Sequence, residues 1–232
     1  MSDQDTALRV CHLGVVDYRA ALELQMRLRE ARQADELPDT LLLLEHPPVY
    51  TRGRRSEPGE LPMGEEWYRM QGIDIVDTDR GGKLTYHGPG QLVGYPIMRI
   101  SDVVAYLRTM ERAIIASLAD GGVQAGLREG LTGVWVGERK IGSIGVHVSH
   151  GVTTHGFAVN VENDLQPFEW VVPCGLDGVR MTSIAREVAA PRPGILPGFR
   201  DVVARRFAEA FGRRLHTVAP AELEPAGVPL AR

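Results

Sequence analysis

Apolar and polar positions along the first third of the chain follow strand and helix periods in turn. They alternate over residues 7–14, which predicts a strand, and then recur with helical spacing over 18–34. Asp17 stands directly before this helix and is a residue type that caps helix N-termini. Residues 40–45 are a short apolar run of strand length, and residues 73–79 are another strand candidate. The chain therefore begins as a mixture of strands and helices.

The rest of the pattern adds loops, hairpins and two more helices. Residues 51–65, rich in Gly, Pro and charge, predict a loop. Ser101 is the predicted cap of a helix over 102–119, and residues 133–162 predict successive strands joined by tight turns. Residues 197–215 predict a last amphipathic helix. The apolar face expected for the helix over 102–119 consists of Val103, Leu107, Met110, Ile114 and Leu118.

Hairpins are prominent and strands do not alternate strictly with helices. This order favours an α+β fold with a mixed β-sheet over a doubly wound one. No composition shift marks a domain boundary, so residues 1–217 are expected to form a single catalytic domain. The Pro/Ala/Glu-rich end, 218–232, is expected to be a mobile tail.

Composition narrows the function classes. The chain of 232 residues is 44% hydrophobic and 24% charged, with a net charge of −4, which disfavours a nucleic-acid partner. No apolar run is long enough to span a membrane, and the polar N-terminus lacks a secretory signal pattern. Two distant cysteines are no disulfide framework and no zinc motif is present. We expect a cytoplasmic protein without a bound metal.

Lysine is rare in this chain. Of 26 basic residues only Lys83 and Lys140 are lysine. Arginine stays protonated in proteins, whereas a desolvated lysine can lose its proton. Lys140, just after the hairpin turn at 136–140, is therefore a candidate for a titratable amine, although a solvated hairpin lysine would fit the same pattern.

The two cysteines stand in different contexts. Cys174 lies between Pro173 and Gly175, a turn sequence in which its sulfur can face a cleft. The alternative is a small buried hydrophobic residue, which is what most free cysteines are. Cys11 sits among apolar neighbours in the middle of a predicted strand, and we interpret it as a packing residue.

Residues 80–97 form the most unusual stretch, with five glycines and two prolines before a strand-like tail. Glycines permit close backbone approach to a ligand, but the spacing matches neither nucleotide-binding glycine motif. The segment is a ligand cradle or a tightly packed loop. His155 is either functional or a hydrogen-bonded turn histidine. The basic cluster Arg52, Arg54 and Arg55 is a solvated surface or a docking site for an acidic partner.

Together these segments resemble the lipoyl(octanoyl) transferase family, the octanoyl-[acyl-carrier-protein]–protein transferases. Four stretches carry the resemblance: RGGKLTYHGPGQLVGYPI (80–97), GVWVGERKIGSIGV (133–146), HGFAVNVENDLQPF (155–168) and VVPCGL (171–176). The likeness extends from about residue 10 to about residue 190.

The resemblance implies a fold, a reaction and a site. The fold is that of biotin and lipoate protein ligases, a mixed β-sheet flanked by helices with a smaller sheet beside it. Octanoyl-acyl carrier protein would be the donor, and a lysine of the lipoyl domains of 2-oxoacid dehydrogenases or of the glycine cleavage H protein the acceptor. Cys174 would carry the acyl thioester and Lys140 would lower the thiol pKa, without any cofactor, in a protein that we expect to be a monomer. The implied substrate-binding residues are Arg80, Gly81, Gly82, Lys83, Leu84, Thr85, Tyr86, His87, Ser143, Ile144, Gly145, Gly156, Phe157 and Ala158.

Elementary chemistry refines the role of Lys140. Lowering a thiol pKa from about 8.5 to about 6 raises the thiolate fraction roughly thirtyfold at pH 7. Nucleophilicity then falls about tenfold, so the net gain is only a few-fold. Lys140 is better interpreted as a proton shuttle. We also expect Leu84, Tyr86 and Val93 beside the acyl chain, and backbone N–H groups near Gly145 and Cys174 as the oxyanion hole.

Three other functions remain open. An ATP-dependent lipoate or biotin ligase would share the fold but need no nucleophilic cysteine. A cysteine hydrolase would pair Cys174 with His155 or His87. A binding module for acyl carriers would keep Cys174 for packing alone.

Overall fold

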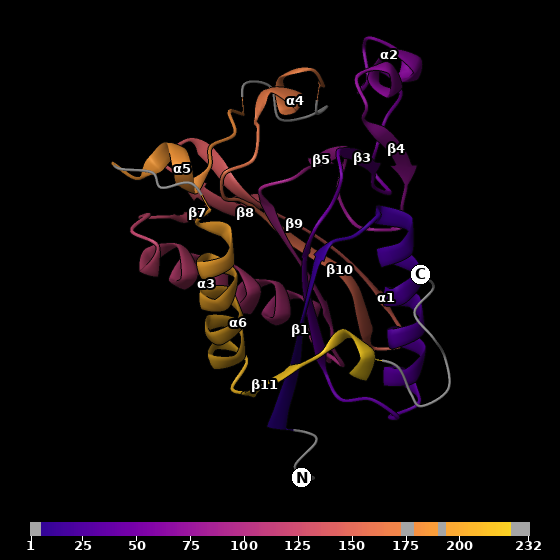
Figure 1. Ribbon diagram of the computed structural model, residues 1–232, viewed down its shortest axis with the longest axis vertical. Helices are drawn as coiled ribbons and strands as arrows, with labels where there is room; N and C mark the ends of the chain where they lie inside the picture. The colour runs from indigo at the N-terminus through magenta and orange to yellow at the C-terminus, as the bar shows by residue number, and fades with distance from the viewer. Residues whose placement is uncertain (1–5, 173–178, 190–193, 224–232) are drawn as a thin grey trace.

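The computed structural model describes residues 6–172, 179–189 and 194–223. Within these ranges an eight-stranded sheet crosses the molecule (Figure 1). Its strands in spatial order are β11 (Arg214–Val218), β1 (Ala7–Val15), β2 (Thr40–Glu45), β6 (Gln91–Ile97), β10 (Val152–Asn160), β9 (Arg139–Ser149), β8 (Leu131–Val136) and β7 (Gly126–Arg128). β1 is parallel to both neighbours and the other pairs are antiparallel. The predicted α+β fold with a mixed sheet is confirmed.

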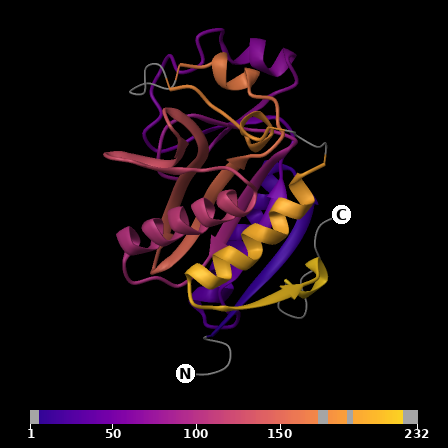
Figure 2. The same ribbon diagram turned by 90° about the vertical axis from the view of Figure 1, so that its left-hand side faces the viewer.

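Helices cover both faces of this sheet (Figures 1 and 2). Helix α1 (Tyr18–Gln33) packs on one face, and α3 (Val103–Asp120) and α6 (Leu196–Ala210) pack on the other. In β2, Leu41 and Leu43 face α3 and α6, whereas Leu42 and Leu44 face α1. Burial on both sides explains why this strand is a continuous apolar run. No helix in the described ranges is long and apolar enough to cross a membrane.

A smaller sheet stands beside the end of the large one. It contains β4 (Asp74–Asp77), β3 (Val49–Arg52) and β5 (Thr85–His87), with α2 (Glu65–Met70) and α4 (Gln166–Glu169) next to it (Figure 1). Tyr50, Tyr68 and Tyr86 form its core. The Tyr50 hydroxyl donates a hydrogen bond to Pro167 O at 2.6 Å, which ties the segment around α4 to this sheet. The predicted loop at 51–65 begins two residues too early, because Thr51 and Arg52 belong to β3.

Helix caps show what local sequence decides. Asp17 caps α1 as predicted, since its carboxylate accepts hydrogen bonds from the first-turn N–H groups. For α3 the prediction of Ser101 was wrong. Asp102 is the cap, and it accepts from the N–H groups of Val104 and Ala105. Val103 begins the helix and is 43% exposed, so it does not belong to the buried face that was predicted.

The C-terminal region departs from the prediction in two ways. α6 ends at Ala210, and Gly212, with φ of 62°, turns the chain into β11 rather than into more helix. β11 pairs with β1, and a short 3₁₀ turn, η2 (Pro220–Glu222), then leads to the fully buried Leu223. Within the expected mobile tail, Val218 and Leu223 are buried whereas residues 219–222 are exposed, and 224–232 lie outside the described residues.

Candidate active site

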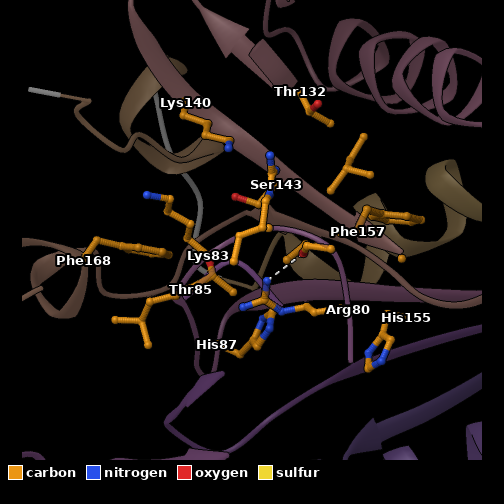
Figure 3. Close-up of a pocket in the computed structure, with 18 of the residues that line it drawn as sticks. Arg80, Lys83, Thr85, His87, Thr132, Lys140, Ser143, His155, Phe157 and Phe168 are labelled. Carbon is orange, nitrogen blue, oxygen red and sulfur yellow. Dashed lines mark hydrogen bonds between the residues drawn. The ribbon is translucent and has the colours of Figure 1, made fainter. Parts of the chain in front are cut away.

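A cavity of about 400 Å³ lies between the 80–87 segment and strands β9 and β10 (Figure 3). Lys140 lines it together with most of the predicted substrate-binding residues. Those lining the cavity are Arg80, Gly81, Gly82, Lys83, Leu84, Thr85, His87, Ser143, Ile144, Gly145, Gly156, Phe157 and Ala158. Tyr86 is the exception. Side chains alternate along β5, so its ring enters the small-sheet core while Thr85 and His87 face the cavity.

Strand pairing brings two of the predicted segments together. Ser143, Ile144 and Gly145 on β9 stand opposite Ala158, Phe157 and Gly156 on β10. The third segment docks on this pair through Gly81, whose N–H donates to Val146 O at 3.0 Å. A Cβ atom on Gly145 would lie 2.7 Å from Gly81 O, so only glycine permits this approach. Three segments distant in sequence thereby form one wall.

The main chain of Lys140 is hydrogen-bonded through both its N–H and its carbonyl group to the segment 180–182. Its N–H donates to Arg180 O at 2.8 Å, and its carbonyl accepts from Thr182 N at 2.9 Å. Desolvation, followed by the positive charge of Arg80, lowers the pKa of the Lys140 amine to about 8. At neutral pH this amine is thus much closer to its titration point than an ordinary lysine.

The space for the Lys140 side chain is made by a glycine. The Lys140 amine lies over the Trp135 ring, 5.5 Å from its centroid. Gly133 has φ of 119°, and a Cβ there would stand 2.8 Å from Lys140 Cε. Glu111 of α3 holds Gly133 by accepting its N–H at 3.2 Å. The lysine therefore occupies a channel that a larger residue at 133 would close.

Arg80 is a buried cation bonded to neutral acceptors. It is 7% exposed and donates to the Thr51 carbonyl at 2.5 Å, the Thr51 hydroxyl at 2.8 Å and Gly81 O at 3.0 Å. Burial lowers the pKa of its guanidinium, which remains charged. This positive charge at the cavity wall favours anionic groups there and disfavours a protonated Lys140.

The histidines at the cavity are held neutral. His155 Nε2 bonds to Asp79 Oδ1 at 2.6 Å, and burial lowers the His155 pKa. His87 Nδ1 bonds to Gln91 Oε1 at 2.7 Å, and burial lowers the pKa of His87 to about 3. Neither ring is a strong base at neutral pH, so Lys140 is the better candidate for moving protons.

Several cavity residues were missed from the sequence. Tyr18 and Tyr95 line it from α1 and β6, and Phe168, Val171 and Met181 line it from segments before and after the predicted cysteine turn. Tyr95, Phe168 and Val171 fall within the stretches that carry the resemblance, whereas Tyr18 and Met181 lie outside them, and none of the five is an unusual residue type. Their hydrophobic spacing indicated only core or turn, because their place at the cavity depends on how separate elements pack.

Cys11 and Val93 both lie in the core, away from the cavity lining. Cys11 is fully buried in β1, and burial raises its pKa to about 11, which confirms a packing role. Val93 does not line the cavity but packs in the core layer beneath α1, so its predicted place beside the acyl chain was wrong. Cys174 lies outside the described residues. Val171 and Val179, the flanking residues nearest to it that line the cavity, are three and five positions away.

Comparison with known proteins agrees with this geometry. A family model described as the lipoyl protein ligase A/B catalytic domain matches residues 17–211. The chain belongs to this family. The match includes Lys140, Cys174 and every predicted substrate-binding residue, so the recognition made from the four sequence stretches is confirmed.

Curated relatives narrow the enzyme class. The octanoyltransferase of Acidobacterium capsulatum is 42% identical over 236 residues, covering 94% of this chain and 96% of the relative. That of Solibacter usitatus is 48% identical, covering 87% and 90%. That of Mycobacterium tuberculosis is 49% identical, covering 79% of each chain. The protein is an acyltransferase of the octanoyltransferase type, and this function is favoured over an ATP-dependent ligase.

Solved structures show the same fold at lower identity. Lipoate-protein ligase A bound with ATP superimposes with a TM-score of 0.73 at 19% identity, covering 94% of this chain and 92% of its own. The bipartite lipoate protein ligase from Thermoplasma acidophilum gives a TM-score of 0.73 at 19% identity, covering 94% and 89%. The predicted ligase-like fold with its smaller sheet is confirmed.

Proposed function

We propose that the protein transfers an octanoyl group from an acyl carrier protein to a lysine of a lipoyl domain through a thioester on Cys174. The observation that carries the proposal is the Lys140 amine. It lines the same cavity as the predicted acyl-binding residues, and its pKa is lowered to about 8. We further propose that the enzyme acts as a monomer in the cytoplasm, where its two cysteines would stay reduced.

The first half-reaction would move the acyl group to the enzyme. The Cys174 thiolate attacks the thioester carbonyl, and the bond from that carbon to the carrier sulfur breaks. The protonated Lys140 amine gives its proton to the departing carrier thiolate and becomes neutral. Charge is balanced, because a thiolate and an ammonium are converted into a thioester and an amine.

The second half-reaction would restore the starting state. The acceptor lysine enters as a neutral amine after releasing one proton to water, and attacks the Cys174 thioester. Neutral Lys140 takes the surplus proton from the attacking nitrogen while Cys174 leaves as a thiolate. Only a titratable amine serves both steps, since an arginine would not accept the proton in the second.

The cavity has the walls that an eight-carbon chain needs. Leu84, Ile144, Phe157, Phe168 and Val171 line it, and they come from separate parts of the fold. Burying about six methylenes contributes on the order of 5 kcal/mol.

Intact-protein mass spectrometry tests the proposal. We expect incubation with octanoyl-acyl carrier protein to add one octanoyl group to the wild type and none to Cys174→Ser. Addition of a lipoyl domain should discharge the adduct faster than water does. Cys11→Ser is the matched control and should remain acylated, because Cys11 is buried away from the cavity. An unmodified wild-type chain would refute the proposal.

The same experiment separates the rival functions. A ligase would need ATP and tolerate Cys174→Ser, whereas a hydrolase would lose its adduct to water as fast as to the lipoyl domain. A carrier-binding module would gain no mass. Burial lowers the pKa of His87 to about 3 and also lowers the pKa of His155, which disfavours a hydrolase that uses either ring as its base.

A further inference from the structure

Two buried carboxamides, Gln91 and Asn160, connect the cavity wall with the segment that pairs with Lys140. His87 Nδ1 lies 2.7 Å from Gln91 Oε1, and Gln91 Nε2 donates to Asn160 Oδ1 at 2.9 Å. Asn160 Nδ2 donates in turn to Thr182 O at 3.0 Å. Asn160 is 1% exposed and Gln91 2%, so water does not compete for these bonds.

The direction of this chain follows from its ends. Gln91 Nε2 also donates to Tyr86 O at 3.2 Å, and Asn160 Nδ2 faces Thr182 O. Both of these are carbonyl oxygens, which only accept, so both amide nitrogens must point toward them. Gln91 Oε1 is then the acceptor for His87, whose proton sits on Nδ1. All members have one consistent arrangement.

The far end of the chain holds the backbone partner of Lys140. Met181 forms an isolated parallel bridge with Lys140, made by the Lys140 N–H to Arg180 O and by the Thr182 N–H to Lys140 O. Met181 also lines the cavity. A two-bond bridge is weak by itself, and Asn160 adds a third bond to the same segment from the neighbouring strand β10.

We propose that Asn160 is a positioning residue for acyl transfer, which holds residues 180–182 beside the first residues of β9 and thereby places Lys140 and Met181 at the cavity wall. The inference rests on the proposed function, in which Lys140 moves protons. With the segment in place, water is kept from the amine. If it loosens, Lys140 becomes hydrated and its pKa rises toward the ordinary value of 10.5.

The charges around Lys140 would stay the same when Asn160 is replaced. Arg55, Arg80 and Lys83 line the cavity with Lys140, and Arg128 lies over the same Trp135 ring. Glu111 bonds the neighbouring Gly133, and Arg139 and Arg180 adjoin the lysine through the main chain. Asn160 is uncharged, so its replacement by alanine alters hydration and position but no charge. A pKa change in that variant would therefore report the placement of the segment.

Lysine NMR tests the inference directly. The chain has only two lysines, so ¹³Cε-labelled lysine gives two titrating signals, which Lys83→Arg assigns. We expect Asn160→Ala to raise the Lys140 pKa by about one unit. Amide hydrogen exchange at Lys140 and Thr182 should accelerate at least about tenfold. kcat should fall about tenfold or more, while KM for the octanoyl donor changes less than about twofold.

Asn163→Ala is the matched control. Asn163 donates to the same Asn160 oxygen at 3.3 Å but does not reach Thr182. It should leave the Lys140 pKa and both exchange rates near wild type. Asn160→Leu keeps a side chain of similar size without adding a charge, but it cannot donate to the Thr182 carbonyl, so it should reproduce the alanine effects if Asn160→Ala does not fold.

The lysine titration and the hydrogen exchange distinguish failure of the inference about Asn160 from failure of the proposed function. An unchanged Lys140 pKa and unchanged exchange in folded Asn160 variants would overturn the inference. Equal changes in the Asn163 control would do the same, because they would indicate general loosening. A wild type without acyl transfer would refute the proposed function, yet the titration and the exchange would still decide whether Asn160 places Lys140.

Discussion

The Asp79 carboxylate accepts a hydrogen bond from His155 Nε2 at 2.6 Å. This bond joins the loop that leads into Arg80 to the strand that carries Gly156 and Phe157, so it helps to hold two walls of the cavity together. His155 has φ of 57°, an unfavourable backbone conformation that its side-chain bond helps to maintain. The pair is structural support for the cavity.

Replacing Asp79 by asparagine should therefore weaken the fold. The His155 bond lowers the pKa of Asp79 to about 2, so the stabilising carboxylate is fully present above about pH 4 and lost as the pH falls toward 2. Because Asp79 is 41% exposed, we expect Asp79→Asn to cost only about 1 kcal/mol in urea unfolding at pH 7. Asp77→Asn, at an 82% exposed site, is the control, and an equal loss there would argue against the pair.

Acid should begin to destabilise the protein at a pH well above the range in which carboxylates become protonated. Burial lowers the pKa of His46 to about 4 and of His87 to about 3, whereas both titrate near 6.5 when unfolded. Between the folded-state pKa values and 6.5, the folded state thus binds fewer protons than the unfolded state. Stability is fully present above pH 6.5 and falls by about 1.4 kcal/mol per pH unit for each histidine below it.

Urea unfolding between pH 7.5 and 5 measures this slope. His87→Gln should reduce the change of unfolding free energy with pH by about 1.4 kcal/mol per pH unit. His216→Gln, at an exposed site, should leave this slope unchanged. If the slope of His87→Gln matches that of the wild type, His87 is not the neutral buried group that its surroundings indicate.

Lys140→Arg should abolish turnover although the positive charge remains. Arginine does not release or take up a proton near neutral pH, and its larger head must enter the channel beside Gly133. We expect kcat to fall at least a hundredfold, measured by octanoyl transfer to a lipoyl domain. Arg205→Lys on α6, remote from the cavity, is the control. An active Lys140→Arg enzyme would end the proton-shuttle hypothesis.

Gly133→Ala tests the channel itself. The added Cβ would stand 2.8 Å from Lys140 Cε and 2.6 Å from Gly142 O, so the amine should move and kcat should fall at least about tenfold. Gly137→Ala is the matched control, since its φ of 58° is also strained for alanine but nothing lies within 4 Å. Both variants should lose about 1–3 kcal/mol of stability. Equal activity in the two would show that the contact with Lys140 is unimportant.

Charge reversal tests carrier docking. Arg52 is paired with Glu65 at 2.5 Å, which leaves exposed Arg54 and Arg55 as the candidates for an acidic partner. Because Arg55 also lines the cavity, Arg54→Glu is the cleaner variant, and it should raise KM for the octanoyl carrier severalfold, with added salt narrowing the difference. The KM for a small octanoyl thioester serves as the control. Unchanged KM values for the carrier would remove this docking hypothesis.

Local pattern predicted the elements best where one residue type has one physical role. Asp17 was found because its carboxylate can bond the first-turn N–H groups, and the apolar run at 40–45 because both faces of β2 are buried. Ser101 and Asp102 are both good caps, so the sequence did not distinguish them, and geometry chose Asp102. The predicted helix over 197–215 included the first two residues of β11, and the strand was missed because its pairing with β1 is a contact between the two ends of the chain.

The sequence by itself determined the candidate site residues. These are Lys140, one of only two lysines, the glycine-rich segment beginning at Arg80, and the strands that contain Gly145 and Gly156. Only the tertiary structure decided that Lys140 shares a cavity with them, that Tyr86 turns away from it, and that Asn160 reaches Thr182. The reason is physical. Residue type and period act over a few neighbouring positions, whereas strand pairing and desolvation join groups far apart in the chain, and desolvation is the main cause of the lowered Lys140 pKa.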